Sequence, residues 1–474
     1  MKNYSLSILL IFVLIGCASK KAIDPEDIGI DNIPENWANE TPITINISDI
    51  WWNEFQDKKL NEFLSQFLNE NINLEQAMLN TRIAKQASVI STSNLFPSIA
   101  ISSSAGESEQ NSAGLPSIFT DLFGGESGEI TTFNQENYSL SLSTQWEIDL
   151  WGKMRQGRLA GKQQYLSAQY NYTYYQFSLT SEATKLYFSI IESKQLVKNA
   201  EKKYDNAKII FDLYTSRYNK GIISLKALQQ SELVLNLTKS DFENKKSIAS
   251  SLVREAKVLI KEYPNLELDT AIEFPKSIPN IPTVLPADIV KRRPDLIASQ
   301  YNLLASKALD KQAMRSLYPS FSLVGSKGTS SNVQDLLNDD FSVWSTGVNL
   351  LAPVFNAGKL IANKKIAKTN KEIAMLEFVN NLLTAYKEVE SGLEFDQSSQ
   401  LSLQLLKDNI VLSKSIYDTT FEEFSKGVAS IEEVINANNA LFDNKNMLAS
   451  VERIRIEQRI NLILALGGGF TYKQ

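Results

Sequence analysis

The sequence SKGVAS, Ser425 to Ser430, lies inside a tail from Val354 onward that contains no proline. A near copy, NKGIIS at Asn219 to Ser224, lies in a second proline-free run between Pro116 and Pro264. Around the two hexamers the sequence reads as helix, where an interior glycine costs about 1 kcal/mol relative to alanine. A turn-like hexamer in each run therefore indicates two helices joined by a tight turn.

Apolar and aromatic residues recur every seven positions around each hexamer. The first half has Ala183, Ile190, Val197, Tyr204, Phe211 and Tyr218, a second series of Leu186, Ser193, Ala200, Ala207 and Tyr214, and after the turn Leu228, Leu235, Phe242, Ala249 and Ala256. The second half has Val389, Asp396, Leu403, Ile410, Tyr417 and Phe424. This repeat is the pattern of coiled-coil packing, so we expect an antiparallel coiled-coil hairpin in each half.

The chain contains an internal duplication. LFPSIAISSS at Leu95 matches LYPSFSLVGS at Leu317, and the same offset pairs Asn71-Ile72-Asn73-Leu74 with Arg293-Pro294-Asp295-Leu296. Gly152-Lys153 matches Gly358-Lys359 at a shorter offset, which the two hexamers share. The first half is therefore longer between its matched blocks. Its extra residues fall in the Gly-, Ser-, Glu- and Asn-rich segment 106–137, which we expect to be an exposed loop.

Between these landmarks the sequence predicts strands. Tyr138 to Leu150 reads YSLSLSTQWEIDL, with large apolar residues on one face and mostly serine, amide and acidic residues on the other. Residues 344–350 alternate in the same way, and Ile99 with Ile101 and Phe321 with Leu323 mark two more strands. A soluble sheet packed on a core also alternates, but serine-rich opposite faces are typical of transmembrane β-strands. Four strands cannot close a barrel, and lipid does not tolerate an open sheet edge, so several chains would have to share one barrel.

The composition excludes several classes of function. The chain has 474 residues, a net charge of −6, a mean hydropathy of −0.19, no histidine and one cysteine. Histidine-based catalysis, the usual zinc sites and an internal disulfide are therefore excluded, and nothing favours nucleic-acid binding. An enzyme that uses carboxylates alone remains possible, but nothing in the composition indicates one, and we expect no cofactor other than a covalent lipid.

That lipid is predicted by the N-terminus, MKNYSLSILLIFVLIGCASK. Leu6 to Ile15 is an apolar core too short to span a bilayer, which needs about 20 residues, and it reads as a secretory signal. Its end, Leu14-Ile15-Gly16-Cys17, resembles a bacterial lipobox, in which the cysteine is acylated, palmitate included, and becomes the first mature residue. An ordinary signal with an incidental cysteine is the alternative. Ala18 in place of aspartate favours the outer membrane by resemblance to sorted lipoproteins.

These signals predict six segments along the chain. They are a signal peptide at 1–16, a lipidated extended segment at 17–52, a first repeat at 53–262, a proline-rich connector at 263–286, a second repeat at 287–466, and a tail at 467–474. In the first repeat we expect a helix from Glu54 to Ser93, strands at 96–106 and 138–150, and a hairpin tip at 219–224. In the second repeat we expect strands at 318–327 and 341–352 and a tip at 425–430.

Taken together, the lipobox, the duplicated plan, the FPS and YPS strand entries and the WEIDLWGK and APVFNAGK junctions resemble the TolC-like outer-membrane efflux proteins of the OprM/NodT lipoprotein branch. The resemblance covers nearly the whole mature chain. It implies a mixed α and β fold in which a homotrimer forms a 12-stranded transmembrane β-barrel continuous with a periplasmic α-helical coiled-coil barrel. It also implies a passive exit duct for small molecules, docked to a periplasmic adaptor and an inner-membrane transporter of the RND type.

The resemblance also implies roles for the two hairpin tips. Lys220, Gly221 and Ile222, with Lys426, Gly427 and Val428, match the residues that meet the adaptor. Glu432, Glu433 and Asn436 fall where the family narrows its tunnel with acidic side chains, although Asn436 stands where an aspartate is common. A ring of Glu433 side chains would favour cations and could hold a divalent ion. The alternative is that both glutamates are solvated helix-surface charges.

Two other functions remain open at this point. A channel of this type could secrete proteins rather than small molecules. A periplasmic coiled-coil lipoprotein that conducts nothing would explain the helices but leaves the strands unexplained.

The lipobox makes a direct prediction for Cys17. Cys17→Ser removes the thiol to which the lipid is attached, so we expect the variant to incorporate no labelled fatty acid, whereas the unaltered protein is labelled. Unchanged labelling of the variant would refute the lipobox.

Overall fold

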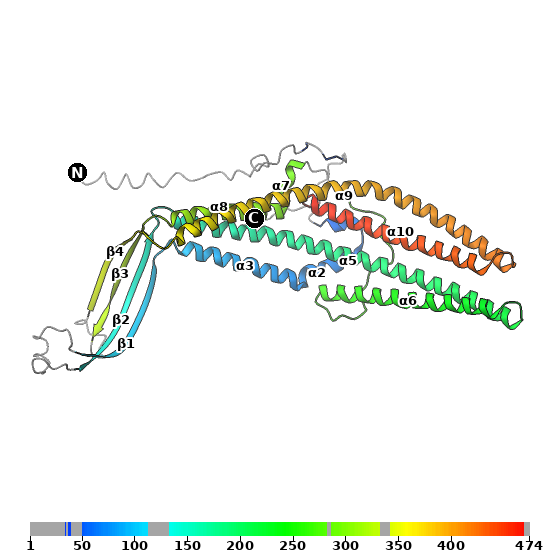
Figure 1. Ribbon diagram of the computed structural model, residues 1–474, viewed down its shortest axis with the longest axis horizontal. Coiled ribbons are helices and arrows are strands. Elements are labelled where there is room, and N and C mark those ends of the chain that lie inside the picture. The colour runs from blue at the N-terminus through cyan, green and yellow to red at the C-terminus, as the bar shows by residue number, and fades with distance from the viewer. Residues whose placement is uncertain are drawn as a thin grey trace, which may run out of the picture.

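The structure is a computed structural model that describes Pro34, Trp37 and Ala38 and residues 50–111, 132–281, 286–331 and 342–468. These residues form a long body with a sheet at one end and two helical hairpin tips at the other (Figure 1). The predicted signal peptide, Cys17 and the tail after residue 468 lie outside the described residues.

The sheet is antiparallel and has the strand order β1-β2-β3-β4. Its strands are β1 (Ser98–Asn111), β2 (Thr132–Ile148), β3 (Ser320–Ser331) and β4 (Ser342–Leu351). Because β2 pairs with β3, with Trp146 opposite Leu323, the two repeats contribute one hairpin each to a continuous sheet. Within the described residues, β1 and β4 pair on one side only, so both edges of the sheet are open in a single chain.

The two faces of the sheet differ in chemistry, as the alternation predicted. In the observed register one face carries Ile99, Ile101, Leu140, Leu142, Trp146, Ile148, Phe321, Leu323, Trp344, Val348 and Leu350. On the other face serine hydroxyls meet across strands at 2.9, 2.7 and 2.9 Å in the pairs Ser102–Ser141, Ser104–Ser139 and Ser326–Ser345.

The predicted limits of the first strand hairpin were wrong. There β1 runs on to Asn111 and β2 begins at Thr132, so the two ends of the predicted exposed loop, at 106–111 and 132–137, are paired strand. The prediction failed because strand pairing continues beyond the apolar band into residues that are polar on both faces, where alternation gives no signal. In the second hairpin β3 (Ser320–Ser331) runs four residues past the predicted 318–327, whereas β4 (Ser342–Leu351) lies within one residue of the predicted 341–352 at each end.

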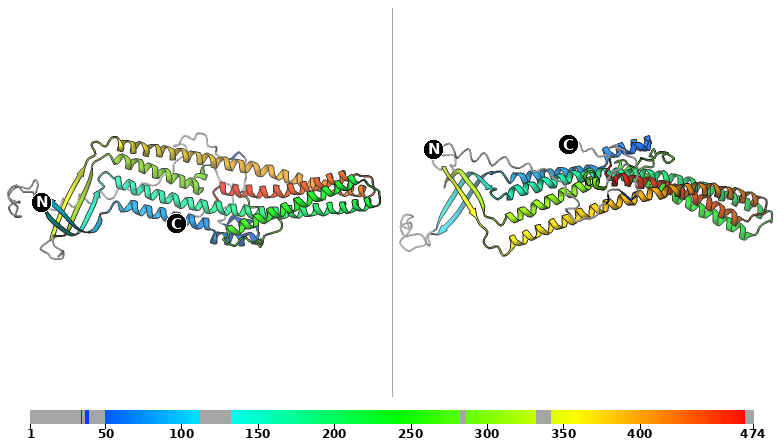
Figure 2. Two further views of the ribbon diagram at one scale, coloured as in Figure 1. Left: turned by 60° about the horizontal axis from the view of Figure 1, so that its bottom comes forward. Right: turned by 90° about the horizontal axis from the view of Figure 1, so that it is seen from above.

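Next to the sheet, four helices lie side by side in one curved layer in the order α3, α5, α8, α9 (Figures 1 and 2). They are α3 (Ile72–Ser93), α5 (Lys153–Asn219), α8 (Pro294–Arg315) and α9 (Lys359–Ser425). Toward the tips the order is α6, α5, α10, α9, because α6 (Leu225–Leu259) and α10 (Ile431–Ala465) replace α3 and α8. The 67-residue helices α5 and α9 span both regions, at roughly 100 Å each at 1.5 Å per residue.

The two long helices begin at matching glycines. Gly152 and Gly358 precede α5 and α9 with φ angles of 77° and 83°, in the left-handed region that favours glycine. At the first junction the Asp149 carboxylate accepts hydrogen bonds from the backbone N–H groups of Met154 and Arg155, at 3.0 and 2.8 Å. These contacts turn the chain sharply from strand into helix.

The single helix predicted from Glu54 to Ser93 was wrong. The segment forms a 3-10 turn, η3 (Trp51–Phe55), then α2 (Lys58–Glu70), and only then α3. The break is at the buried Asn71, whose side-chain oxygen accepts the N–H of Leu74 at 3.1 Å while its nitrogen donates to the Leu259 carbonyl at 2.8 Å. The Asn71 side chain therefore caps the start of α3 and binds the end of α6. These bonds favour a non-helical backbone at Asn71, so α2 ends there and does not continue into α3.

Arg293 occupies the matching place in the second repeat. It follows the short elements η4 (Pro286–Asp288) and α7 (Ile289–Arg292), and it donates to the Ala465 carbonyl at the end of α10 at 3.3 Å. Its guanidinium also pairs with Asp295 at 2.7 Å and Glu388 at 2.6 Å. In each repeat, therefore, one buried side chain at the start of a helix near the sheet (α3 or α8) binds a carbonyl at the end of a helix that leads to the tips (α6 or α10).

The proline-rich connector packs against the middle of the body. The buried Tyr187 hydroxyl donates to the Asp57 carboxylate at 2.8 Å and accepts from the backbone N–H of Ala271 at 2.9 Å. Phe274 packs against Phe188, with ring centroids 6.5 Å apart. The connector is thereby tied to both α2 and α5 over the main hydrophobic core.

The heptad prediction needs one correction. Beyond Ile190 the second predicted series is the more buried one, with Ser193, Ala200, Ala207 and Tyr214 buried, while Tyr218 of the first series is 38% exposed. The reason is that α5 packs against both α6 and α10, so its buried surface does not follow a single two-helix seam. The polar Asp396 in the second-half series is paired with the buried Arg459 of α10.

The sheet predicts a large difference between two of its glycines. A Cβ at Gly328 in β3 would overlap the Leu140 carbonyl oxygen and lie 2.6 Å from the Ser141 Cα, whereas one at Gly347 would meet only the Val324 Cγ2 at 3.6 Å. We expect Gly328→Ala to lower the free energy of unfolding by about 1–3 kcal/mol, the usual cost of overpacking.

The matched Gly347→Ala should behave as the unaltered protein. Urea unfolding of the detergent-solubilised protein, followed by tryptophan fluorescence, measures both. Equal unfolding midpoints for the two variants would show that β2 and β3 do not approach as described.

Candidate functional site

The fold brings the two hairpin tips, which carry the residues predicted to contact an adaptor, to one end of the molecule (Figure 1). At the first tip Gly221 has φ 73°, its N–H donates to the Tyr218 carbonyl at 2.8 Å, and the next N–H, from Ile222, donates to the Arg217 carbonyl at 2.9 Å. At the second tip Gly427 has φ 81° and the same two-bond pattern. This pattern of a left-handed glycine after a helix is the Schellman ending.

The tips present apolar side chains beside lysines. Ile222 and Val428 are 67% and 77% exposed, and Lys220 and Lys426 stand next to the two glycines. The Lys426 ammonium pairs with Glu422 at 2.5 Å. Nothing described lies within 4 Å of a Cβ built on either glycine, so the backbone of both turns is accessible.

An aromatic stack, which the sequence reading did not single out, joins the two tips. Tyr214 of α5 and Phe424 of α9 lie parallel, with ring centroids 5.9 Å apart and planes at 8°, and the Arg217 guanidinium lies 5.1 Å from the Phe424 centroid. Ile210, Ile431 and Val434 complete this small core. Tyr214 and Phe424 both occupy heptad positions, so the sequence indicated that each is buried. The heptad repeat could not show that the two side chains contact each other.

The structure gives Glu433 a definite contact. Its carboxylate accepts the backbone N–H of Ser430 at 2.6 Å, while the Ser430 hydroxyl accepts the N–H of Glu433 at 3.3 Å. This reciprocal pair is a capping box at the start of α10, and the hydrogen bonds from Ser430 lower the pKa of the Glu433 carboxyl. Glu432 and Asn436 are exposed in the single chain.

The first tip lacks this box. Ser224 caps α6 by accepting the N–H of Ala227 at 3.3 Å, but Ala227 stands where Glu433 stands in the second repeat and offers no carboxylate. The two tips therefore share a turn and differ in how the returning helix is held.

The middle of the body holds two ion-paired arginines that the sequence reading also missed, of which Arg459 is buried and Arg453 half-buried. Arg459 of α10 pairs with Asp396 of α9 and donates to the Pro279 carbonyl in the connector. Arg453 pairs with Glu192 of α5 at 2.5 Å. Buried charges need partners of this kind, and these link α5, α9, α10 and the connector. They are far from one another in sequence, so no local pattern reveals them.

At the sheet end, aromatic residues mark the junction between strands and helices. The indole N–H of Trp146 donates to the Leu95 carbonyl at 3.0 Å, and that of Trp151 donates to the Pro319 carbonyl at 2.7 Å. Phe355, in the segment between β4 and α9, is 89% exposed. Among the described residues, no helix has both the length and the apolar composition needed to cross a membrane.

The chain is similar in sequence to proteins of one family along most of its length. The family model described as "Outer membrane efflux protein" matches residues 63–247 and 285–468, one match in each repeat. The chain is 26% identical over 426 residues to the "Toluene efflux pump outer membrane protein TtgF" of Pseudomonas putida, which covers 89% of this chain and 85% of that protein.

Two further relatives extend over nearly the whole chain. The "Pyoverdine export outer membrane protein OpmQ" of Pseudomonas aeruginosa is 24% identical, with 99% of this chain and 97% of that protein covered. The "Probable outer membrane lipoprotein SilC" of Salmonella typhimurium is 23% identical, with 98% of each chain covered.

Solved structures share the fold. The Campylobacter jejuni CmeC outer membrane channel superposes with a TM-score of 0.83 at 24% identity, over 94% of this chain and 95% of that one. The Vibrio cholerae outer membrane protein VceC gives a TM-score of 0.76 at 18% identity, over 90% of this chain and all of that one. The mixed helical and sheet architecture predicted from the sequence is therefore confirmed.

The capping box separates two roles for Glu433. Glutamine also serves at this position of a capping box. If Glu433 acts mainly as a cap, Glu433→Gln should keep most of the protection at the start of α10 and Glu433→Ala should lose it. Amide hydrogen exchange at residues 430–436 measures this, with Glu432→Gln as the control. Equal loosening by Glu433→Gln and Glu433→Ala would show that the charge matters rather than the cap.

The same contact predicts a pH dependence. Because its pKa is lowered in the folded tip, Glu433 stabilises α10 above the ordinary glutamate pKa, and the contribution is lost as pH falls through the lowered value. The protection factors of the amides at residues 430–436, which correct for slower intrinsic exchange at low pH, should therefore fall on acidification in the unaltered protein and change less in Glu433→Gln.

Proposed function

Because the chain belongs to the outer membrane efflux protein family, we propose that three copies of it form the exit duct of a tripartite pump that exports small molecules. As a member of this family the chain is an outer-membrane efflux component and not an enzyme. The observation that carries the proposal is the four-stranded sheet. It has one mostly apolar face, on which Lys327 lies opposite Leu142 and Trp344, one serine-lined face and two open edges.

The open edges require other copies of the chain. In a bilayer every backbone N–H and C=O must find a partner within the protein, so a four-stranded sheet has to close with further strands. Three copies supply twelve strands, an even number within the range of antiparallel outer-membrane barrels. The serine face would then line a polar lumen, and the apolar face would meet lipid.

The height of the apolar face supports a membrane span. From Ile148 to Tyr138 β2 extends about 33 Å at 3.3 Å per residue, which a tilt of roughly 40° reduces to about 25 Å along the barrel axis. This is the height of the apolar band of outer-membrane barrels. Tyr138 stands near one end of the band and Trp146 near the other, as the aromatic girdles of such barrels do.

The helical layer is incomplete in the same way. The edge helices α3, α6 and α9 each leave one side uncovered in a single chain. Exposed apolar side chains gather on them: Ile83, Val89 and Ile90 on α3, Leu233 and Leu237 on α6, and Leu376, Leu401, Leu405, Val411 and Leu412 on α9. Packing α9 of one copy against α3 and α6 of the next would cover these residues and close a tube below the barrel.

The two repeats explain how one chain reaches from lipid to tip. We infer a first repeat at 53–262 and a second at 287–466 joined by the connector at 263–286, and the two separate matches to the family model support this division. Each repeat supplies one strand hairpin and one helical hairpin. The trimer would therefore contain six similar repeats and have approximate sixfold symmetry.

Cys17 would anchor each copy. We infer a covalent lipid there, palmitate included, because the only cysteine in the chain ends a lipoprotein-type signal and the relative SilC is named an outer membrane lipoprotein. Two or more acyl chains give stable anchoring.

At the opposite end the tips would meet the partners. The exposed Ile222 and Val428, the accessible glycines and the lysines beside them suit docking of a periplasmic adaptor, through which an inner-membrane transporter of the RND type would deliver cargo. Glu432, Glu433 and Asn436 would lie just above these tips, with the Glu433 carboxylate already bound to Ser430.

Planar-bilayer recording tests the duct. The purified protein should insert as a stable oligomer and conduct ions, and substitutions that loosen the tips, such as Glu433→Ala, should raise the conductance. A lipoprotein that conducts nothing, even after such substitutions, would instead be a structural spacer.

Adaptor docking tests the tips. Proline holds φ near −65°, which is incompatible with the φ of 81° at Gly427, whereas asparagine tolerates the left-handed region. We expect Gly427→Pro to weaken crosslinking to the adaptor at least tenfold while oligomers still form, and Gly427→Asn to be close to the unaltered protein. Loss of oligomers in Gly427→Pro would make Gly427 a folding residue only.

A further inference from the structure

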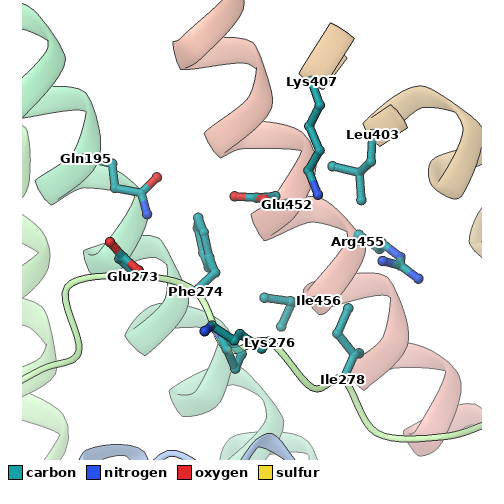
Figure 3. Close-up of a pocket in the computed structure, with 11 residues that line it drawn as sticks. Gln195, Glu273, Phe274, Lys276, Ile278, Leu403, Lys407, Glu452, Arg455 and Ile456 are labelled. Atoms are coloured by element: carbon teal, nitrogen blue, oxygen red, sulfur yellow. The ribbon is translucent and has the colours of Figure 1, made fainter. Parts of the chain in front are cut away.

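A cavity of about 490 Å³ lies under the connector, between α5, α9 and α10 (Figure 3). Its volume falls in the range of small-molecule sites, roughly 300–1,000 Å³. Its lining is mostly polar, and apolar contacts come from Phe274 and Ile278 of the connector, Leu403 of α9 and Ile456 of α10.

The charges in this cavity are of both signs and lie on different sides. Glu452 directs its carboxylate toward Gln195 of α5 and Glu273 of the connector, while Lys407 and Arg455 lie on the side of α9 (Figure 3). Lys276 adds a cation at the connector rim. Charges of both signs therefore line the cavity, and the Glu452 carboxylate faces the side of α5 and the connector.

Three of these charged groups form no ion pair in the part of the chain that the structure describes: Glu452, Lys407 and Arg455. The nearby Arg453 and Arg459, by contrast, each pair with a carboxylate. The Arg455 Nε is buried and makes no hydrogen bond. Burial raises the pKa of the Glu452 carboxyl, and Lys407 offsets this in part. An unpaired buried donor and an unpaired carboxylate each cost free energy that a bound partner would recover.

We propose that this cavity binds a zwitterionic ligand of about dipeptide size, with its ammonium at Glu452 and its carboxylate at Arg455 and Lys407. Glu452 and Arg455 stand three residues apart on α10, about 5–6 Å between Cβ atoms. An extended dipeptide spans roughly 7 Å at 3.3–3.6 Å per residue, which matches two side chains reaching from that separation. Phe274 and Ile456 would contact the ligand's side chains.

Such a ligand would bridge the connector to α9 and α10, elements that already meet through Arg459 and the Pro279 carbonyl. Binding would add contacts between segments far apart in the sequence and so stabilise the middle of the molecule. Free periplasmic peptides and the peptide branches of the cell wall share this chemistry and would both fit.

Isothermal titration calorimetry of the purified full-length protein with alanyl-alanine tests the site. We expect saturable binding that is at least tenfold weaker in Glu452→Gln and in Arg455→Gln, and absent for N-acetyl-alanyl-alanine amide, which lacks both charges. Glu201→Gln, an exposed carboxylate on α5, is the matched control and should bind as the unaltered protein does.

Each other result would overturn the proposal: no saturable binding, equal binding of the blocked dipeptide, or unchanged binding in both cavity variants. Retention of the protein on purified cell-wall sacculi, lost in Glu452→Gln, would identify the cell-wall peptide as the source; binding of the free dipeptide without such retention would identify soluble peptides. Conductance in planar bilayers should be the same in all variants, so failure of this site is distinguishable from failure of the duct.

Discussion

The open edges of a single chain govern its architecture. The sheet ends in β1 and β4, the helical layer ends in α3, α6 and α9, and the apolar side chains of these edge helices face outward. Unpaired strand edges cannot remain in lipid, and apolar helix faces of this length are unfavourable in water. One protomer is therefore an incomplete part of a barrel. Its edge strands and edge helices gain neighbours on both sides only when copies of the chain pack side by side.

Because of the duplication, the sheet and the helical layer of one chain continue from the first repeat into the second without a gap. β2 pairs with β3, and α5 packs against α8 and α10, so the strongest contacts between the repeats run along the whole length of the molecule. At the level where tip-side helices end and sheet-side helices begin, Asn71 and Arg293 carry out the same task with different chemistry. The asparagine satisfies one carbonyl as a neutral amide. The arginine needs Asp295 and Glu388 to balance its charge, so the second junction depends on three residues where the first depends on one.

Much of this could be predicted from the sequence, because the deciding signals are local and repeated. The glycine hexamers placed both turns, and the alternation of YSLSLSTQWEIDL placed an apolar and a serine face that the register confirms. Strand ends could not be predicted, since pairing such as Glu107 opposite Glu136 is set by the neighbouring strand and not by hydrophobicity. The break at Asn71 was hidden because its second partner, Leu259, lies 188 residues away. The same limit applies to the Tyr214–Phe424 stack and to Arg459 with Asp396, whose partners only the fold brings together.

The tips show how duplicated elements diverge while keeping one backbone. Gly221 and Gly427 have nearly the same φ, and Ser224 and Ser430 cap the returning helices in the same way. Only the second helix adds a carboxylate from Glu433 to its cap, and an added cap contact lowers the tendency of the first helical turn to fray. A negative charge near a helix N-terminus is also favourable to the helix dipole, so the charge that would face an aperture is the same charge that holds α10 in place. Any process that draws the Glu433 carboxylate toward a cation or a partner must first release Ser430, and this couples the chemistry of the aperture to the order of the second tip.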